Sequence, residues 1–213
     1  MQVDVQSVIY WRTEHICLHY KNKIMITLPS PVTERTIYLS KQIDASSIND
    51  IVKELHKIIA SDSDVSRFCQ IERGFSYSPE PIRIYINSSG GSVYSMLGLY
   101  DIIRMSPTPV YTYAYGMAAS AAAVLLAAGK RRFATAHSFM LIHSVSSWLT
   151  GKVEELKDGL EQAERLNNLI NKLLTEHTRI PVSRLADKDR YKEDWWISAP
   201  EALELGIIDE IIG

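Results

Sequence analysis

Three times in succession, a short apolar strand in this sequence is followed by an amphipathic helix. Strands that alternate with helices in this way favour a parallel sheet. The sequence therefore predicts an α/β fold. The expected strands cover 36–39, 82–86 and 110–114, and the expected helices, the first capped by Ser46 or Ser47, cover 48–59, 93–105 and 116–128.

The second half of the chain adds a long helix and several shorter elements. Apolar residues of the helix expected at about 152–178 form one wide stripe, which a single chain would leave largely exposed. Burial of this stripe against another subunit is the natural outcome. Short strands are expected at 132–134, 139–142 and 207–212, with a short helix that begins at Ser198.

The length of 213 residues is enough for one large domain with its own core. Short β-rich runs at 3–10 and 16–26 precede a Pro-Ser-Pro break, so residues 1–32 are expected to be an N-terminal appendage. Residues 33–213 are expected to form the single main domain. Within it, 61–81 is rich in Asp, Ser, Gly and Pro, which predicts a long surface loop.

Composition excludes several classes of function. A net charge of −2 without a basic tract argues against binding to nucleic acid or to an anionic membrane. Two cysteines outside any CxxC or Cys/His cluster argue against a disulfide framework and a metal site. The sequence shows no leader or membrane-spanning segment, so we expect a soluble cytoplasmic protein. It also shows no GxxxxGK[ST] loop, so we expect ATP to be bound only by a partner protein.

Ser120 is a single hydroxyl in a run of small apolar residues that follows Gly116. It is expected at a junction between a strand and a helix, where the first helical amides lack partners and the helix dipole stabilises negative charge. Such a junction can present a nucleophile. A serine among alanines is also common where helices pack closely, and this stretch alone does not decide between the two roles.

A serine nucleophile needs a base, and His143 is the best placed of the six histidines because it directly follows the strand expected at 139–142. The imidazole in turn needs an acceptor that fixes its tautomer. Asp194, just before two tryptophans, is expected to be partly desolvated and suits this role better than Asp187 or Asp189, which are expected to be exposed. Periodicity alone does not choose among these carboxylates.

Backbone amides at a glycine turn can stabilise the oxyanion of such a reaction. Gly91 and Ala121 are the candidate donors. Gly90 and Gly91 carry no side chain, so an extended substrate could approach and pair with this backbone as an added strand. The alternative is a plain tight turn.

Four segments together resemble the Clp protease proteolytic subunit family. They are Ile86–Ser92 (INSSGGS), Gly116–Ala121 (GMAASA), Met140–His143 (MLIH) and Asp194–Ala202 (DWWISAPEA), and they occur in the family's order. The resemblance runs from about residue 34 to residue 212.

This resemblance implies a serine endopeptidase with the crotonase-like α/β fold of repeated β-β-α units. Carried over position by position, its nucleophile falls on Ser120, its base on His143 and its acid on Asp194. Its oxyanion amides fall on Gly91 and Ala121. It implies no metal and no cofactor.

The family resemblance also implies an assembly. Subunits of the family form a tetradecamer of two stacked heptameric rings, joined through a protruding handle helix that corresponds here to about 152–178. An AAA+ unfoldase feeds unfolded proteins to the inner chamber, and the rings alone cleave short peptides.

The sequence departs from the family pattern in four places. The segment before Thr33 does not resemble the family's axial loop, and the region 61–81 is longer than usual. Ser144–Gly151 stands where the family has a proline and paired glycines, and Glu193 replaces a basic residue. Two other functions are therefore weighed: an acyl-CoA enzyme of the crotonase type, and a catalytically silent ring subunit.

Overall fold

A computed structural model describes residues 9–12, 15–18, 26–27, 32–74, 76–146 and 150–213. At the N-terminus, three short strands form an antiparallel sheet of their own in the order β1-β2-β3. Most of the strands expected at 3–10 and 16–26 lies outside the described residues. The three strands are β1 (Ile9–Arg12), β2 (His15–Leu18) and β3 (Ile26–Thr27).

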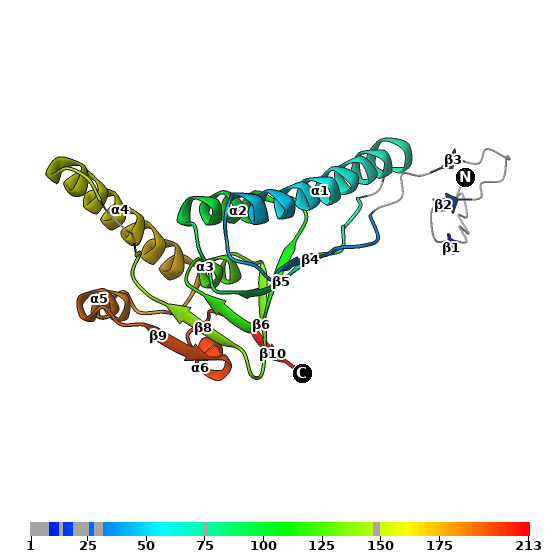
Figure 1. Ribbon diagram of the computed structural model, residues 1–213. Helices are drawn as coiled ribbons and strands as arrows, with labels where there is room; N and C mark the ends of the chain where they lie inside the picture. The colour runs from blue at the N-terminus through cyan, green and yellow to red at the C-terminus, as the bar shows by residue number, and fades with distance from the viewer. Residues whose placement is uncertain (1–8, 13–14, 19–25, 28–31, 75, 147–149) are drawn as a thin grey trace.

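The main domain is built on a seven-stranded sheet with helices against it (Figure 1). Five strands are parallel in the order β10-β7-β6-β5-β4, and β8 and β9 extend the sheet from the end of β6. The mixed α/β prediction is confirmed. The strands are β4 (Thr36–Leu39), β5 (Ile82–Ser88), β6 (Val110–Ala119), β7 (Arg131–Thr135), β8 (Phe139–Ile142), β9 (Trp195–Ser198) and β10 (Glu210–Ile212).

Alternation along the central strands explains the two faces of the sheet. Ile82, Ile84 and Ile86 of β5 are fully buried in the core that the helices cover. The opposite face carries a row of stacked aromatic rings across four neighbouring strands, with ring centroids 4.5–5.6 Å apart. The row consists of Tyr38, Tyr85, Tyr113 and Phe133.

Helix α1 (Ala45–Arg73) is much longer than the sequence predicts. Its cap is Asp44, which accepts a hydrogen bond from the Ser47 amide at 2.7 Å, and Gly74 ends it in the left-handed conformation. The prediction of a loop at 61–81 is therefore wrong for residues 61–73, which belong to α1. The Asp and Ser residues that suggest a loop lie on a helix, because Asp62 is buried in an ion pair with Arg35 (2.7 Å).

Strand β6 is also longer than expected, and helix α3 (Ala121–Ala127) is shorter. The first half of β6 pairs with β7, whereas Met117–Ala119 pairs with β8. Gly116, with a φ of 83°, lies between the two halves, and the Asn87 side chain accepts a hydrogen bond from the next amide at 3.2 Å. The strand thus changes partners at a glycine instead of ending there.

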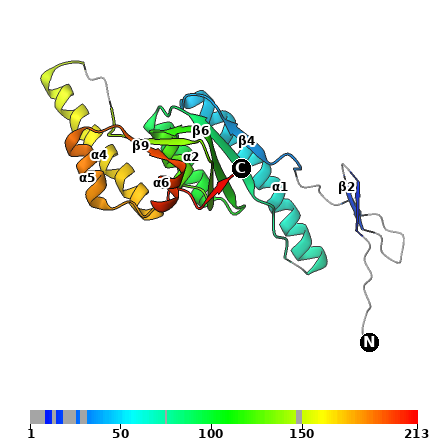
Figure 2. The ribbon, with the colours of Figure 1, turned by 90° about the horizontal axis from the view of Figure 1, so that it is seen from below.

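Helix α4 (Val153–His177) confirms the expected long helix, and it projects from the sheet (Figure 1). Only Leu174 of this helix is buried, and Val153, Leu160 and Leu169 are 65%, 55% and 38% exposed. Figure 2 shows α5 (Val182–Tyr191) beside α4, at the end of the molecule opposite to the C-terminal half of α1. Helices α2 (Val93–Met105) and α6 (Ala199–Glu204) complete the domain.

Candidate active site

Ser120 lies at the turn between β6 and α3, as the sequence predicts, and its backbone is strained. Its φ and ψ angles are 56° and −122°, a conformation that residues with a side chain seldom adopt. Its amide donates to the Leu141 carbonyl at 2.8 Å, which ties the turn to β8. A serine on a sharp, strained turn from a strand to a helix is the arrangement that exposes the nucleophile of many hydrolases.

Gly90 packs directly against this turn. A Cβ atom at Gly90 would lie 2.5 Å from the Ala119 carbonyl oxygen and 2.8 Å from the Ser120 Cβ. No L side chain fits there. The sequence marks Gly90 for substrate approach, and the structure adds that its missing side chain makes room for the serine turn.

Gly91 forms an isolated parallel bridge with Ile43. The Gly90 carbonyl accepts from the Ile43 amide, and the Ser92 amide donates to the Ile43 carbonyl, both at 2.8 Å. In a parallel bridge of this kind, the amide and carbonyl of the middle residue point away from the partner. The Gly91 amide therefore faces away from Ile43, and it lies at the same small cavity as Ser120.

Ala121 is the first residue of α3, and an amide at this position has no intrahelical acceptor. Both Ala121 and Gly91 line the cavity of about 50 Å³ that Ser120 and His143 share. The structure thus brings together the candidate nucleophile, base and both candidate oxyanion donors. The remaining wall is largely apolar and includes Val93, Val124, Ile142, Ile170 and Leu174.

His143 directly follows β8 and is half-buried, and Asp194 directly precedes β9. These two strands are antiparallel, with Ile142 opposite Trp195. Continuing the register by one residue places His143 opposite Asp194, and directly opposed residues have Cβ atoms about 4.5–5.5 Å apart. Both residues line a second cavity of about 650 Å³.

One expectation about Asp194 is wrong. Its side chain is exposed, not partly desolvated, because β9 begins one residue later and only its inward positions, such as Ile197, are buried. Ser120, His143 and Asp194 all belong to the described residues, and none of their side chains is hydrogen-bonded to another of the three. Active-site hydrogen bonds in proteins without substrate are often formed only when substrate binds.

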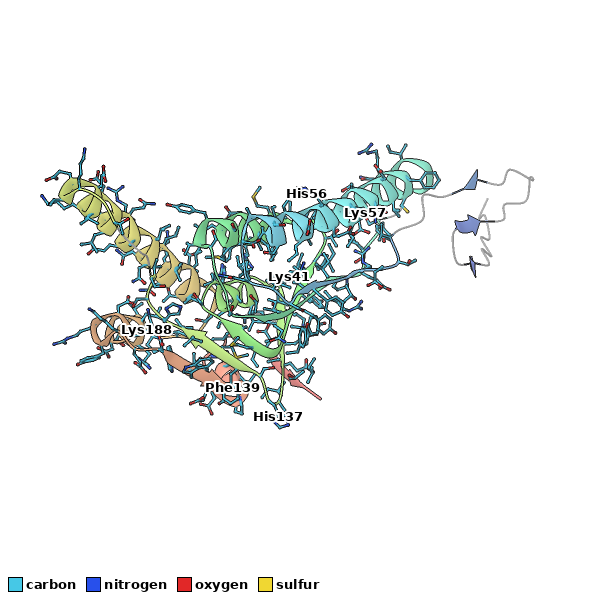
Figure 3. All side chains as sticks on the ribbon, in the orientation of Figure 1. Lys41, His56, Lys57, His137, Phe139 and Lys188 are labelled. Atoms are coloured by element: carbon cyan, nitrogen blue, oxygen red, sulfur yellow. The ribbon has the colours of Figure 1, made fainter. Side chains whose placement is uncertain are left out.

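The expectation that Asp189 is exposed is also wrong. This carboxylate on α5 is partly buried and accepts hydrogen bonds from four side chains. Burial by itself would raise the pKa of Asp189, but these hydrogen bonds outweigh it and hold the pKa below its usual value. The donors are Lys188, which is fully buried (Figure 3), Ser144 (2.7 Å), Asn167 (2.8 Å) and Asn171 (2.7 Å).

This network distinguishes the two carboxylates near His143. Asp189 is engaged by its four donors and links α4 and α5 to Ser144, the residue after His143. Asp194 accepts no hydrogen bond from any described residue and lines the same cavity as His143. The geometry therefore favours Asp194 as the partner of the imidazole and Asp189 as a structural anchor. This anchor was not expected from the sequence, since no helix was expected at 182–191.

Within the described residues, no group of three His, Cys, Asp or Glu side chains is placed to hold a metal ion. In the same part of the chain, no helix combines the length and the apolar character that crossing a membrane requires.

Replacing Gly90 should disable the site without a change at Ser120 itself. We expect Gly90→Ala to reduce peptide hydrolysis by at least ~100-fold, because the methyl group collides with the serine turn and a misplacement of about 1 Å can have that effect. Turnover of a fluorogenic peptide measures the loss. Gly98→Ala in α2 is the matched control, since a Cβ atom there meets nothing within 4 Å, and equal turnover in both variants would contradict the assignment.

A strained serine turn at the end of parallel strands, beside a glycine turn and a histidine, defines an α/β protein of the serine hydrolase class. The sequence profile described as Clp protease matches residues 75–213. The ATP-dependent Clp protease proteolytic subunit of Porphyromonas gingivalis is 35% identical over 182 residues, 84% of this chain and 74% of that protein.

Other relatives agree. The ATP-dependent Clp protease proteolytic subunit 1 of Mycobacterium leprae is 33% identical over 184 residues, which cover 85% of this chain and 83% of that protein. The ATP-dependent Clp protease proteolytic subunit of Bacteroides thetaiotaomicron is 33% identical over 182 residues, 84% of this chain and 74% of that protein. The chain belongs to the Clp protease family and is a serine endopeptidase of the Clp type.

Proposed function

We propose that this chain is the proteolytic subunit of a self-compartmentalised protease in which Ser120 is the nucleophile, His143 the base and Asp194 the carboxylate that orients the imidazole. The observation that carries the proposal is the strained turn at Ser120, which shares one cavity with His143, Gly91 and Ala121. Among the described residues, this is a complete set of groups for acyl transfer apart from the carboxylate. The support for Asp194 is that it lines a second cavity together with His143 and directly precedes β9, which pairs with β8.

In the proposed reaction, the Ser120 hydroxyl oxygen attacks the carbonyl carbon of a peptide bond while His143 accepts its proton. The Gly91 and Ala121 amides donate hydrogen bonds to the oxyanion that forms. His143 then gives the proton to the departing amine, and the C–N bond breaks to leave an acyl-enzyme ester on Ser120. A water molecule, deprotonated by His143, hydrolyses the ester and restores the serine.

The mechanism is tested by a fluorophosphonate probe, which reacts with an activated serine. Labelling of the assembled protein followed by mass analysis of its peptides should place the probe on Ser120. A protein that assembles but does not label would favour the catalytically silent subunit. An unreactive Ser120 together with measurable binding of coenzyme A would favour the acyl-CoA enzyme.

The small cavity beside Ser120 predicts which side chain precedes the cleaved bond. Among the described residues, its wall is largely apolar and contains no charged acidic or basic partner other than His143, so a charged side chain would lose hydration there with little compensation. Among fluorogenic peptides that differ only at this position, we expect apolar residues to give a kcat/KM at least ~10-fold above Asp or Lys. The reason is that burial of an apolar side chain should stabilise the transition state by about 1–3 kcal/mol relative to a charged one. A preference for a charged residue would contradict this placement of the substrate.

For the assembly, we propose two stacked heptameric rings joined through α4, located in the cytoplasm. The support is the apolar surface of α4, where three large side chains are well exposed and only Leu174 is buried in the single chain. Native mass spectrometry tests this proposal. A particle of fourteen subunits is expected, and a monomer at micromolar concentration would overturn it.

Unfolded proteins are the proposed natural substrates, delivered by an AAA+ unfoldase, because the relatives are named as subunits of ATP-dependent proteases. These 213 residues contain no GxxxxGK[ST] loop that would bind the ATP. The cavity next to Ser120 is small, which suits an extended chain and not a folded domain. Degradation of an unfolded protein should therefore require the partner and ATP, whereas cleavage of short peptides should not.

A further inference from the structure

The two sequence neighbours of Asp194 are held by one side chain. The Arg184 guanidinium donates two hydrogen bonds to the Glu193 carboxylate, at 2.7 and 2.8 Å. The same guanidinium lies 4.0 Å from the centre of the Trp195 ring. Residues on both sides of Asp194 are thus fixed to α5 through Arg184.

Asp194 itself has little else to hold it. It is exposed and accepts no hydrogen bond from the described residues, and the pairing of β9 with β8 begins only at Trp195. The preceding connection from α5 is short and turns through Lys192, whose φ is 52°. Its backbone is tied to α5 by two hydrogen bonds, from the Lys192 amide to the Asp189 carbonyl (3.4 Å) and from the Glu193 amide to the Lys188 carbonyl (3.0 Å).

We propose that Arg184 is a positioning residue for Asp194, which clamps Glu193 and Trp195 so that the carboxylate between them faces His143. This inference rests on the catalytic role proposed above for Asp194. It also gives Glu193 a role within its own chain, at a position where the family resemblance predicts a basic residue.

The chemistry of the clamp requires arginine. A guanidinium is planar and forked, so it can bind a carboxylate through two parallel hydrogen bonds and stack its face on an aromatic ring at the same time. A lysine would keep the charge but lose the fork and the flat face. Arg184→Lys therefore weakens the clamp without changing the net charge. Arg184→Met removes both the clamp and the positive charge.

A purely structural role makes a different prediction. The Arg184 and Glu193 side chains are 29% and 40% exposed, and ion pairs at such positions contribute little to folding stability. Displacement of a catalytic carboxylate, in contrast, can lower the rate strongly. The clamp should therefore affect turnover much more than unfolding.

The shape of the pH profile of kcat/KM gives a second readout. A purely structural role of Arg184 would leave this profile unchanged, whereas displacement of the Asp194 carboxylate should change it. The charged groups that share the larger cavity with His143 are Glu164, Asp189, Lys192, Glu193 and Asp194.

The experiment compares peptide turnover in the assembled wild-type, Arg184→Met, Arg184→Lys and Arg190→Met proteins. Arg190 is the matched control, since it lies on the same helix and is exposed, with its guanidinium 5.5 Å from the Tyr191 ring. We expect Arg184→Met to lower kcat ~10- to 100-fold with little change in KM, Arg184→Lys to lower it less, and Arg190→Met to leave it unchanged.

A double-mutant cycle decides whether Arg184 acts through Asp194. In an Asp194→Ala background, where residual turnover is measured at high enzyme concentration, Arg184→Lys should have no further effect. The same fold loss in both backgrounds would overturn the proposal, and so would an unchanged turnover and pH profile in Arg184→Met. If Arg184→Met fails to assemble, the cycle with Arg184→Lys gives the answer.

Failure of this inference is separable from failure of the proposed function. If wild-type Ser120 does not react with the fluorophosphonate probe, the catalytic assignment fails. If it reacts, and Arg184→Met reacts at the rate of Arg190→Met, only the positioning role fails.

Discussion

Replacement of Ser120 by alanine is expected to abolish hydrolysis of fluorogenic peptides, with a loss of at least ~10⁴-fold in kcat. The residual rate is what substrate binding and the oxyanion donors provide without a nucleophile. Labelling by the fluorophosphonate probe should disappear as well. The particle should remain assembled, because the substitution removes only one oxygen atom at a half-exposed turn and leaves the packing of the flanking alanines unchanged.

Two controls make this result specific. Ser46→Ala changes an exposed serine at the start of α1, distant in the sequence from the site, and should leave turnover unchanged. The oligomeric mass of Ser120→Ala should equal that of the wild type. Turnover retained by a correctly assembled Ser120→Ala protein would eliminate the proposed mechanism.

Replacement of His143 by alanine should have an effect of similar size, about 10⁴-fold or more in kcat, because the serine hydroxyl then has no base to accept its proton. The pH profile of kcat/KM should also differ between the wild type and His143→Ala, because the variant has lost its general base.

His137→Ala is the matched control for the second prediction. His137 lies in the turn between β7 and β8, six residues before His143, and its side chain is exposed and labelled in Figure 3. Its replacement should leave both turnover and the pH profile of kcat/KM unchanged. If His137→Ala and His143→Ala lose activity equally, the base is not the residue at the end of β8.

Much of the fold follows from local sequence patterns. Buried alternation along β5 and the apolar spacing of α2 and α4 predict these elements nearly to their observed bounds. The junction at Ser120 is confirmed, because a glycine and a run of helix-forming alanines flank it. The catalytic roles of Ser120, His143 and Asp194 stay predictions, which the variants above test.

Three features could not be predicted from local patterns, each for a long-range reason. Helix α1 continues past residue 61 because Asp62 is buried against Arg35 and Thr108, which lie 27 and 46 residues away in the sequence. Strand β6 continues past Gly116 because β8 offers it a second partner. Asp189 is withdrawn from solvent by side chains of α4, so its sequence neighbourhood alone misleadingly suggests exposure.

The sequence by itself determined the alternating strands and helices, the turn at Ser120 and the residue types that acyl transfer requires, because these depend on periodicity and on single positions. Only the tertiary structure decided how they meet. Strand β8 pairs with the end of β6 beside the serine turn, His143 and Asp194 line one cavity at the ends of the paired strands β8 and β9, and Gly90 leaves room for the turn. Strand pairing and close packing join residues far apart in the chain, and no local pattern encodes such pairs.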